Sequence, residues 1–361
     1  MSLISTAPFL ERRFEFCILA LNPGNLSTQI GYFHDHLEIW REELDHSNIA
    51  LAEFIPDQLA YRLEEISPFL KRIESLHAVA ARGGPLKPMT GGVYSINADM
   101  LDAYKTCTYS NHASNLGALL ADFICSEREI PGYIVDPVTT DEFKPAARLS
   151  GVPGMERKCR SHALNIKYCA VKAVNDLGES HHKYRFIVAH LGSGFSIAAV
   201  ENGRIIDVND ALLGMGPFSV ERAGALPIQG LLDLVFKKGL SEGEIKTLLS
   251  KNSGLRGYLG TADFREIENR LDEAPVRLVY EAMLLQIIKE IGAQYAAFGG
   301  DVDGLILTGG LCYSAKLVQD LKTRLSFISE IFVYAGSYEL EALAESVLRV
   351  IKGDQKAQVY T

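Results

Sequence analysis

Several common signatures are missing from this chain of 361 residues. Its six cysteines form no C-x-x-C pair, so we expect reduced thiols of a cytoplasmic protein rather than metal ligands. No apolar run reaches the roughly 18 residues that a membrane span needs, and the N-terminal segment lacks a signal-peptide core. A net charge of −9 disfavours a general nucleic-acid binder. We therefore expect small-molecule partners, with no nucleic acid and no membrane.

Two familiar nucleotide-binding motifs are also missing. There is no G-x-x-x-x-G-K-[ST] sequence, which excludes a Walker-type phosphate loop. Gly192-Ser193-Gly194 lacks the third glycine of the dinucleotide fingerprint and leads into a predicted strand, which argues against a Rossmann dehydrogenase. Any nucleotide site must therefore collect its hydrogen-bond donors elsewhere. The length of the chain favours two domains over one.

A β-meander is predicted in the middle of the chain. Phe186–Ala189 and Phe195–Val200 are apolar runs that are joined by the turn Gly192–Gly194 and followed by the hairpin signal Asn202-Gly203. Glycines allow backbone N–H groups to approach a ligand closely, and Ser193 adds a hydroxyl donor, which suits a phosphate chain. An ordinary tight hairpin is the alternative for this stretch taken alone.

The same pattern occurs near the N-terminus, where Phe16–Phe33 reads as strand, polar glycine turn and strand. Aligning Ile18 with Ile187 places Gly24 on Ser193, one residue away from full glycine register. Similar meanders half a chain apart indicate two related domains that face each other. A nucleotide would then lie in the cleft between them.

Two charged residues end predicted strands, at the edge where open sheets bind ligands. Arg82 follows a short apolar strand and precedes two glycines, so it can bind a carboxylate through two hydrogen bonds or be a solvated loop residue. Asp136 ends the strand that begins at Tyr133, where it can hold Mg²⁺ or start a turn before Pro137.

Other candidates have simpler explanations when taken alone. His112 precedes a helix that we expect over Leu116–Ser126, where capping or packing would be its ordinary role. His162 lies in the first turns of a helix that we expect to open within Arg157–Asn165. Arg222 lies in a long glycine-rich segment, of the kind that is usually functional or mobile.

The chain resembles the acetate kinase family of the actin-like ATPase superfamily from about residue 16 to residue 353. The matching runs are N-P-G-x-x-S-T at 22–28, A-R-G-G-P-L-K-P at 81–88, H-A-S-N-L-G at 112–117, I-V-D-P-V at 134–138, R-K-C-R-S-H-A-L-N at 157–165, V-A-H-L-G-S-G at 188–194, G-P-F-S-V-E-R-A-G at 216–224 and L-T-G-G-L-C-Y-S at 307–314.

The resemblance implies an α/β fold of two ribonuclease H-like domains, with mixed sheets flanked by helices and a nucleotide cleft between them. We expect residues 1–164 and 337–361 in the first domain and residues 165–336 in the second, nucleotide-binding domain. The implied reaction is a reversible, in-line transfer of the ATP γ-phosphoryl group to a short-chain carboxylate, butyrate or a branched relative, with Mg²⁺. A homo-oligomer is also implied.

The resemblance also implies roles for individual residues. Arg82 and Arg222 would orient the substrate carboxylate and neutralise the transferring group, Asp136 would act near Mg²⁺ and the attacking oxygen, His162 would donate to phosphoryl oxygens, and His112 would line the acyl site. The implied nucleotide and metal residues are Asn22 and Ser27 on the first hairpin, His190, Gly192, Ser193 and Gly194 on the second, Gly309 and Gly310 beside the adenosine, and Glu341, or else Glu339, holding the metal through water.

Three positions depart from the family pattern. Asn25 replaces a serine of the first hairpin but can still donate a hydrogen bond, Gln29 replaces a lysine of the same hairpin, and Ser161 replaces an aromatic residue beside His162. Gln29 removes a positive charge near the phosphates. Loss of such a charge-assisted hydrogen bond costs roughly 1.5–3 kcal/mol, which corresponds to about a ten- to hundredfold lower rate. A catalytically weak nucleotide-binding paralogue is therefore the alternative. An actin-like assembling ATPase is disfavoured, because the carboxylate-binding arginines would have no purpose there.

Overall fold

The computed structural model describes residues 15–178 and 183–361, so the N-terminal segment that we predict to lack a signal-peptide core lies mostly outside it. The chain divides into two compact units. Unit 1 comprises the residues up to Gly84, Gly92–Val135 and Leu343–Thr361, and unit 2 comprises Pro85–Gly91 and Asp136–Ala342. The contacts thus assign residues 136–164 to unit 2, and the domain limits expected from the sequence remain a proposal. In the described part of the chain, none of the helices is long and apolar enough to cross a membrane.

Unit 1 contains a seven-stranded mixed sheet with the order β12-β5-β6-β4-β1-β2-β3. The first three strands form the predicted antiparallel meander, and β4 and β6 run parallel to β1 and to each other. The strands are β1 (Cys17–Pro23), β2 (Ser27–His34), β3 (Leu37–Asp45), β4 (Ala78–Arg82), β5 (Val93–Ser95), β6 (Gly132–Val135) and β12 (Gln358–Val359).

Unit 2 contains a five-stranded sheet with the order β11-β10-β7-β8-β9. Its strands are β7 (Arg185–Leu191), β8 (Phe195–Glu201), β9 (Arg204–Val208), β10 (Gly304–Gly309) and β11 (Ile331–Ala335). In unit 2 the antiparallel meander is β7-β8-β9, and β10 and β11 run parallel to β7. The strands β3-β2-β1-β4-β6 of unit 1 have the same arrangement. The two sheets therefore repeat one plan, and the prediction of two ribonuclease H-like domains is confirmed.

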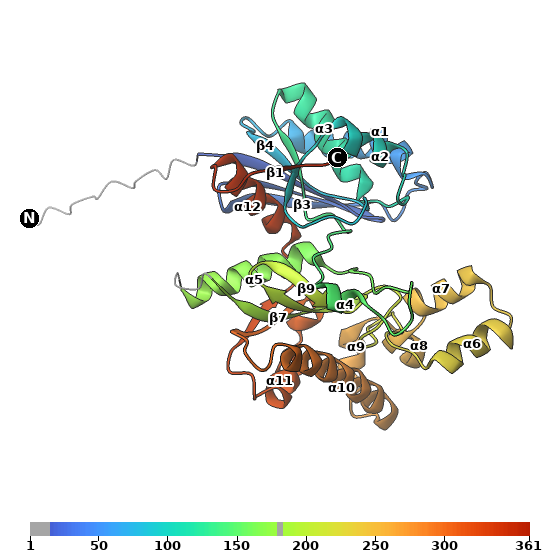
Figure 1. The fold of residues 1–361 in the computed structure, drawn as a ribbon. Helices are drawn as coiled ribbons and strands as arrows, with labels where there is room; N and C mark the ends of the chain where they lie inside the picture. Colours follow the sequence, from blue (N-terminus) through green and yellow to red (C-terminus); the bar gives the residue numbers. More distant parts are fainter. Residues whose placement is uncertain (1–14, 179–182) are drawn as a thin grey trace, which may run out of the picture. The chain divides into compact units, whose positions relative to one another are not determined.

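The helices of unit 1 fill the connections between its strands. They are α1 (Leu59–Leu70), preceded by the 3₁₀ helix η1 (Ile55–Gln58), α2 (Ala98–Lys105), α3 (Asn115–Arg128) and the later turns of α12 (Glu339–Ile351). The helix α3 is largely buried because it packs against β4, β6 and β1 (Figure 1). The sequence analysis missed α2, although Asn97 caps it by accepting a hydrogen bond from the N–H of Met100.

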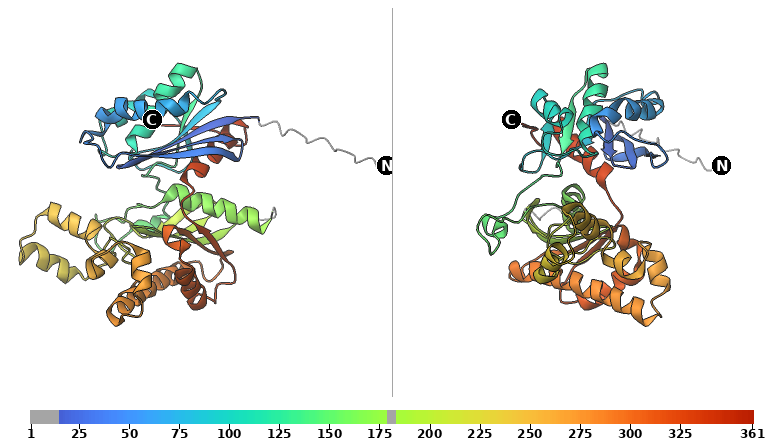
Figure 2. Two further views of the ribbon diagram at one scale, coloured as in Figure 1. Left: turned by 180° about the vertical axis from the view of Figure 1, so that it is seen from behind. Right: turned by 90° about the vertical axis from the view of Figure 1, so that its right-hand side faces the viewer.

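Helices cover both faces of the unit 2 sheet (Figures 1 and 2). Met283, Leu284 and Ile287 of α10 pack on one face, and Ile166 and Ala170 of α5 pack on the other. The helices are α4 (Pro145–Arg148), α5 (Ala163–Leu177), α6 (Ile228–Phe236), α7 (Glu242–Lys251), α8 (Gly254–Leu259), α9 (Phe264–Asn269), α10 (Ala274–Ala297), η2 (Gly310–Tyr313) and α11 (Ala315–Arg324).

One helix start was predicted wrongly. The helix α5 begins at Ala163, so His162 is its N-cap residue and does not lie within its first turns. The reason is local, because the chain before it is held by other contacts, in which the N–H of Arg157 donates to the carbonyl of Arg148. His162 is therefore presented at the entrance of the helix, where its side chain is oriented by tertiary contacts.

A buried histidine supports the first meander of unit 1. The ring nitrogens of His46 lie 3.0 Å from the hydroxyl of Thr28 and 3.0 Å from the hydroxyl of Tyr61. Burial, followed by the positive charge of Arg62, lowers the pKa of His46. The imidazole of His46 therefore binds a proton less readily in the folded protein than in the unfolded chain.

This histidine makes stability depend on pH. Below its unfolded pKa of about 6.5 the unfolded chain binds a proton that the folded chain does not, so stability decreases as the pH falls through that value. We expect the urea midpoint of His46→Gln to fall less between pH 7 and pH 5 than that of the wild type. Equal slopes for the wild type and His46→Gln would contradict this assignment.

Candidate functional site

The first hairpin of unit 1 carries a chain of polar contacts at the end of β1. Arg82 donates from Nη1 to Oδ1 of Asn22 over 3.3 Å, and Asn22 donates from Nδ2 to Oε1 of Gln29 over 3.2 Å. The structure thus brings together Asn22 and Arg82, which come from β1 and β4. Gln29 accepts a hydrogen bond here, which a lysine could not do. The departure from the family pattern therefore has a local partner.

Two other predicted residues of unit 1 flank this chain. Ser27 begins β2, and its carbonyl accepts the N–H of Gly24 over 2.7 Å, which closes the hairpin turn. His112 accepts the N–H of Ser114 at Nδ1 over 3.2 Å, the local capping contact that the sequence suggested. Burial and then the charge of Arg82 lower the pKa of His112. Because Nδ1 accepts a hydrogen bond, the neutral ring carries its proton on Nε2.

In unit 2 the guanidinium of Arg222 lies against the second hairpin. A Cβ atom at Gly194 would come within 2.2 Å of its Nη1, so only glycine allows this approach. Arg222 also donates from Nη1 to the carbonyl of Ala211, and burial lowers the pKa of its guanidinium. Ser219 donates from Oγ to the carbonyl of Ser193 over 2.5 Å and accepts the N–H of Arg222 over 3.2 Å. The irregular segment is thus fixed to the hairpin, partly by Ser219, which the sequence analysis did not identify.

The two histidines of unit 2 are stacked. The rings of His162 and His190 lie 3.9 Å apart with an interplanar angle of 11°. His162 is hydrogen-bonded through Nδ1 to Oγ of Ser196 over 2.9 Å. His190 accepts at Nδ1 from Nδ2 of Asn165 over 2.9 Å, which leaves its proton on Nε2. Two imidazolium charges at this separation would repel each other.

Asn165 links the second hairpin to two other elements. It is completely buried. Its Nδ2 also donates to the hydroxyl of Thr308 over 3.1 Å, and its Oδ1 accepts the N–H of Tyr338 over 2.9 Å. The sequence analysis counted Asn165 only as a motif residue. A buried amide beside two motif histidines is the signal that could have identified it.

Asp136 belongs to a buried ionic cluster. Lys167 donates from Nζ to Oδ1 of Asp136 over 2.8 Å and to Oε1 of Glu142 over 3.3 Å. Although burial opposes the charge, these carboxylates raise the pKa of Lys167. Asp136 has a φ of 37°, which is unusual for a residue with a side chain. The ion pair thus holds the carboxylate in place, and neither Lys167 nor Glu142 was recognised from the sequence.

Gly91 covers this cluster. Its N–H donates to Oε1 of Glu142 over 3.1 Å, and a Cβ atom there would lie 2.0 Å from Nζ of Lys167 and 2.6 Å from Oδ1 of Asp136. The M-T-G-G-V-Y sequence of residues 89–94 would by itself suggest a mobile loop. The structure instead anchors it at this point.

We expect Gly91→Ala to inactivate the protein, because the added methyl group displaces the cluster that holds Asp136. Overpacking of this kind also costs about 1–3 kcal/mol of stability. The measurements are the rate of the phosphoryl transfer that the resemblance implies and the urea midpoint. Gly151→Ala is the control, since a Cβ atom at Gly151 would have no atom within 4 Å. Wild-type activity in Gly91→Ala would show that the cluster tolerates displacement.

The remaining predicted residues lie around the ends of β7 and β10. A Cβ atom at Gly192 would lie 3.3 Å from Nε2 of His190. Gly309 has a φ of 95° and faces the backbone of Leu191, so its missing side chain serves packing between strands. In contrast, a Cβ atom at Gly310 would have no neighbour within 4 Å. Glu339 and Glu341 lie in the first turn of α12, as predicted.

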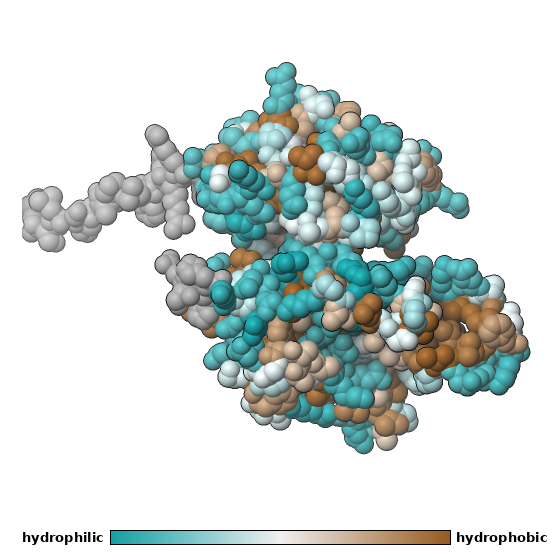
Figure 3. All heavy atoms as spheres, in the orientation of Figure 1, coloured by the Kyte–Doolittle hydropathy of each residue, from teal (hydrophilic) through white to brown (hydrophobic). Residues whose placement is uncertain are grey.

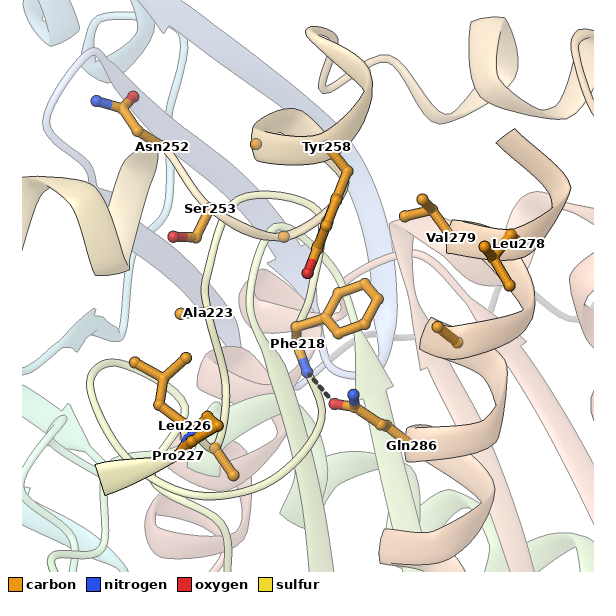
Figure 4. Close-up of a pocket in the computed structure, with 14 residues that line it drawn as sticks. Phe218, Ala223, Leu226, Pro227, Asn252, Ser253, Tyr258, Leu278, Val279 and Gln286 are labelled. Carbon is orange, nitrogen blue, oxygen red and sulfur yellow. Dashed lines mark hydrogen bonds between the residues drawn. The ribbon is translucent and has the colours of Figure 1, made fainter. Parts of the chain in front are cut away.

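A cavity of about 600 Å³ lies beside the segment that carries Arg222 (Figure 4). Phe218 and Leu226 line it from this segment, Tyr258 from α8, and Leu278 from α10. The N–H of Phe218 donates to Oε1 of Gln286 over 3.1 Å across one wall. None of its lining residues is charged, so it cannot neutralise a phosphate chain. It is therefore not the phosphate site.

The predicted metal ligands Asn22, Asp136 and Glu341 all offer oxygen atoms, which is the donor chemistry that Mg²⁺ requires. Asp136 and Glu341 belong to unit 2 and Asn22 to unit 1. No group of three or more His, Cys, Asp or Glu side chains suited to a metal occurs in residues 15–178 and 183–361. The carboxylates of Asp136 and Glu341 thus have the donor chemistry that fits a magnesium ion.

Comparisons with known proteins agree on one family. The model of the acetokinase family matches residues 154–330. A probable butyrate kinase of Clostridium botulinum (strain Alaska E43 / Type E3) is 42% identical over 351 residues, which cover 95% of this chain and 99% of the relative. A probable butyrate kinase of Enterococcus faecalis (strain ATCC 700802 / V583) is 40% identical over 350 residues, which cover 95% and 97% of the two chains.

Solved structures show the same fold. A propionate kinase from Francisella tularensis subsp. tularensis SCHU S4 superposes with a TM-score of 0.74 at 22% identity, covering 92% of this chain and 99% of that one. An acetate kinase from Porphyromonas gingivalis superposes with a TM-score of 0.74 at 21% identity, with the same coverage of each chain.

Proposed function

Because this chain belongs to the acetokinase family and is an ATP-dependent carboxylate kinase, we propose that its substrate is butyrate or a branched relative of butyrate. The observation that carries the proposal is the 40–42% identity, over nearly the whole chain, to relatives named probable butyrate kinase. The reaction is reversible, and its product is an acyl phosphate.

The chemistry needs no covalent intermediate with the protein. A carboxylate oxygen attacks the γ-phosphorus of ATP, the bond from that phosphorus to the β–γ bridging oxygen breaks, and ADP leaves with the electron pair. Positioning and neutralisation of charge provide most of the acceleration in such transfers. Groups that are fixed and positively charged, or that donate hydrogen bonds, are therefore the ones that matter.

The proposed roles follow the contacts of each residue. Arg82 orients the substrate carboxylate, supported by its hydrogen bond to Asn22. Arg222 neutralises the transferring phosphoryl group, because its guanidinium is held beside Gly194 of the second hairpin. His162 donates to phosphoryl oxygens, and His112 lines the acyl site. The second hairpin binds the nucleotide phosphates through backbone N–H groups and His190.

We further propose that Mg²⁺ accompanies ATP. Asp136 and Glu341 would hold it, mainly through water, and Asn22 would contribute its amide oxygen. A bound magnesium ion neutralises phosphate charge and orients the phosphate chain. Lys167 donates to Oδ1 of Asp136 and so helps to fix the orientation of this carboxylate.

The test is acyl-phosphate formation from Mg-ATP, trapped with hydroxylamine, with a panel of straight and branched acids of two to five carbons. We expect a clear preference for four- or five-carbon acids. A preference for acetate would overturn the proposed substrate, although the enzyme would remain a carboxylate kinase. No product from any acid, with ATP still bound, would favour the weak paralogue, for which Gln29 is the only warrant and which none of the comparisons supports.

We propose that the protein is a cytoplasmic homo-oligomer. Its cysteines in the described residues are all free thiols, as expected for a reducing compartment. Four apolar side chains of α6, α8 and α10, namely Ile228, Phe236, Tyr258 and Leu278, are each at least 70% exposed. Figure 3 shows an apolar region on the part of the surface where α6 and α8 lie. Apolar surface of this kind usually marks an interface. Light scattering tests the assignment by comparing the wild type with the double variant Phe236→Glu/Leu278→Glu. The double variant should have a lower molar mass in solution than the wild type, and an unchanged mass would contradict an interface at this surface.

A further inference from the structure

Arg62 is a completely buried arginine in α1, directly beneath the first hairpin. Its Nη2 donates to the carbonyls of Gly24 and Asn25 over 3.2 and 3.3 Å, and its Nη1 reaches the carbonyl of Ser27 over 3.4 Å. It also donates to Oγ1 of Thr28 over 2.7 Å and to Oε1 of Gln58 over 2.9 Å. One side chain therefore binds most of the carbonyl groups of the turn.

The other groups of the turn can be accounted for one by one. The carbonyl of Leu26 accepts the N–H of His46 over 2.7 Å, and the N–H of Gly24 donates to the carbonyl of Ser27 over 2.7 Å. In contrast, the N–H groups of Asn25 and Leu26 have no hydrogen-bond acceptor within the described residues. Asn25 and Leu26 are both exposed, so these two N–H groups are open to water or to a ligand.

The geometry of the peptide explains this division. In a planar trans peptide the C=O of one residue and the N–H of the next point in opposite directions. Because Arg62 draws the carbonyls of Gly24 and Asn25 inward, the N–H groups of Asn25 and Leu26 point away from it. Consecutive N–H groups on one side of a turn form a site for an anion.

The charge of Arg62 supports the same conclusion. No Asp or Glu oxygen lies within ion-pair distance of its guanidinium among residues 15–178 and 183–361, and its Nε is buried without a hydrogen-bond partner. A buried cation without a counter-charge is unfavourable. An anion on the hairpin would provide the missing negative charge at short range.

We infer that Arg62 is a positioning residue, which fixes the first hairpin so that the N–H groups of Asn25 and Leu26 bind a phosphate group. This inference rests on the proposed function, which identifies the phosphate as one of ATP or of the acyl phosphate. Arg62 acts through the hairpin backbone and does not touch the ligand. The guanidinium of Arg62 also provides a positive charge close to the hairpin, in which Gln29 stands where the family pattern has a lysine.

The test compares Arg62→Gln and Arg62→Lys with the matched control Arg128→Gln. Arg128 likewise donates to two backbone carbonyls of unit 1, those of Leu70 and Ile73. We expect Arg62→Gln to lower kcat/KM for Mg-ATP by about ten- to a hundredfold, with KM for the carboxylate unchanged. Arg62→Lys keeps the charge but loses the fork, so its loss should be smaller. Arg128→Gln should lower the melting temperature and leave both constants unchanged.

Two results would overturn the inference. One is a lower melting temperature in Arg62→Gln with wild-type kcat/KM for Mg-ATP, and the other is an equal kinetic loss in Arg128→Gln. Assay of the reverse reaction with acyl phosphate distinguishes the source of the phosphate, because only the ligand that meets the hairpin should show the lowered kcat/KM. If the wild type phosphorylates no acid, the proposed function fails, and binding of Mg-ADP to wild type and Arg62→Gln still tests Arg62.

Discussion

We expect the replacement of Arg222 by glutamine to lower kcat by about 10²–10³-fold, the loss seen when one fixed donor to developing charge is removed. The guanidinium of Arg222 lies against Gly194, and the backbone N–H of Arg222 donates to Oγ of Ser219. The positive charge is therefore fixed beside the hairpin before any substrate arrives. Lysine should not restore the rate, because a single ammonium cannot reproduce two planar donors. Steady-state assays of Arg222→Gln and Arg222→Lys with Mg-ATP and the preferred acid measure the effect.

A substitution of Arg157 is the control that distinguishes a catalytic role of Arg222 from a structural role. It is also an arginine of unit 2 that donates to backbone carbonyls, those of Ala147 over 2.6 Å and Val208 over 3.0 Å, and it forms an ion pair with Asp207 over 2.8 Å. Arg157→Gln should reduce the free energy of unfolding without changing kcat. A rate for Arg222→Gln that equals the rate of this control would remove Arg222 from the catalytic groups.

Replacing Asp136 with asparagine is expected to lower kcat by a similar factor. Loss of a carboxylate that orients the metal removes several kcal/mol of charge stabilisation, which is about 10²–10³-fold in rate. The substitution also leaves Lys167 with Glu142 as its only carboxylate partner in the cluster. We therefore expect a lower kcat together with a higher Mg²⁺ concentration for half-maximal rate.

Asp141 is the matched control for Asp136. It lies in the same segment and accepts two hydrogen bonds from Arg148, over 2.7 and 2.8 Å. Asp141→Asn breaks an ion pair of comparable geometry away from the lysine cluster, so it should change stability but not the magnesium dependence. If Asp136→Asn required no more Mg²⁺ than the wild type, its carboxylate would have no role at the metal.

The sequence predicted what depends on local pattern. Alternating apolar runs and glycine turns were sufficient to predict both meanders, because strand periodicity and turn chemistry are set within a few residues. The Asn202-Gly203 turn is an example, since both residues have the positive φ that this hairpin requires. The contact between Asn22 and Arg82 was not predicted, although both lie near the ends of neighbouring parallel strands.

The supporting residues could not be predicted in this way. Arg62 occupies a helix that reads as ordinary and amphipathic, and only the tertiary fold shows that it is buried beneath the hairpin. Lys167 likewise looks like a solvent-facing helical lysine until Asp136 and Glu142 are brought to it from another segment. In each case the partner is distant in sequence, and a buried charge can be recognised only from its partners.

The return of the C-terminal segment to unit 1 has a consequence for synthesis on the ribosome. Leu343–Thr361 belongs to unit 1, where β12 pairs with β5 and the carbonyl of Tyr360 accepts a hydrogen bond from Asn97. The earlier strands of unit 1 therefore leave the ribosome while one edge of their sheet is still without its last strand. Unit 2 is translated completely before that strand appears. The order in which the two units are completed during translation is thus the reverse of the order in which they begin.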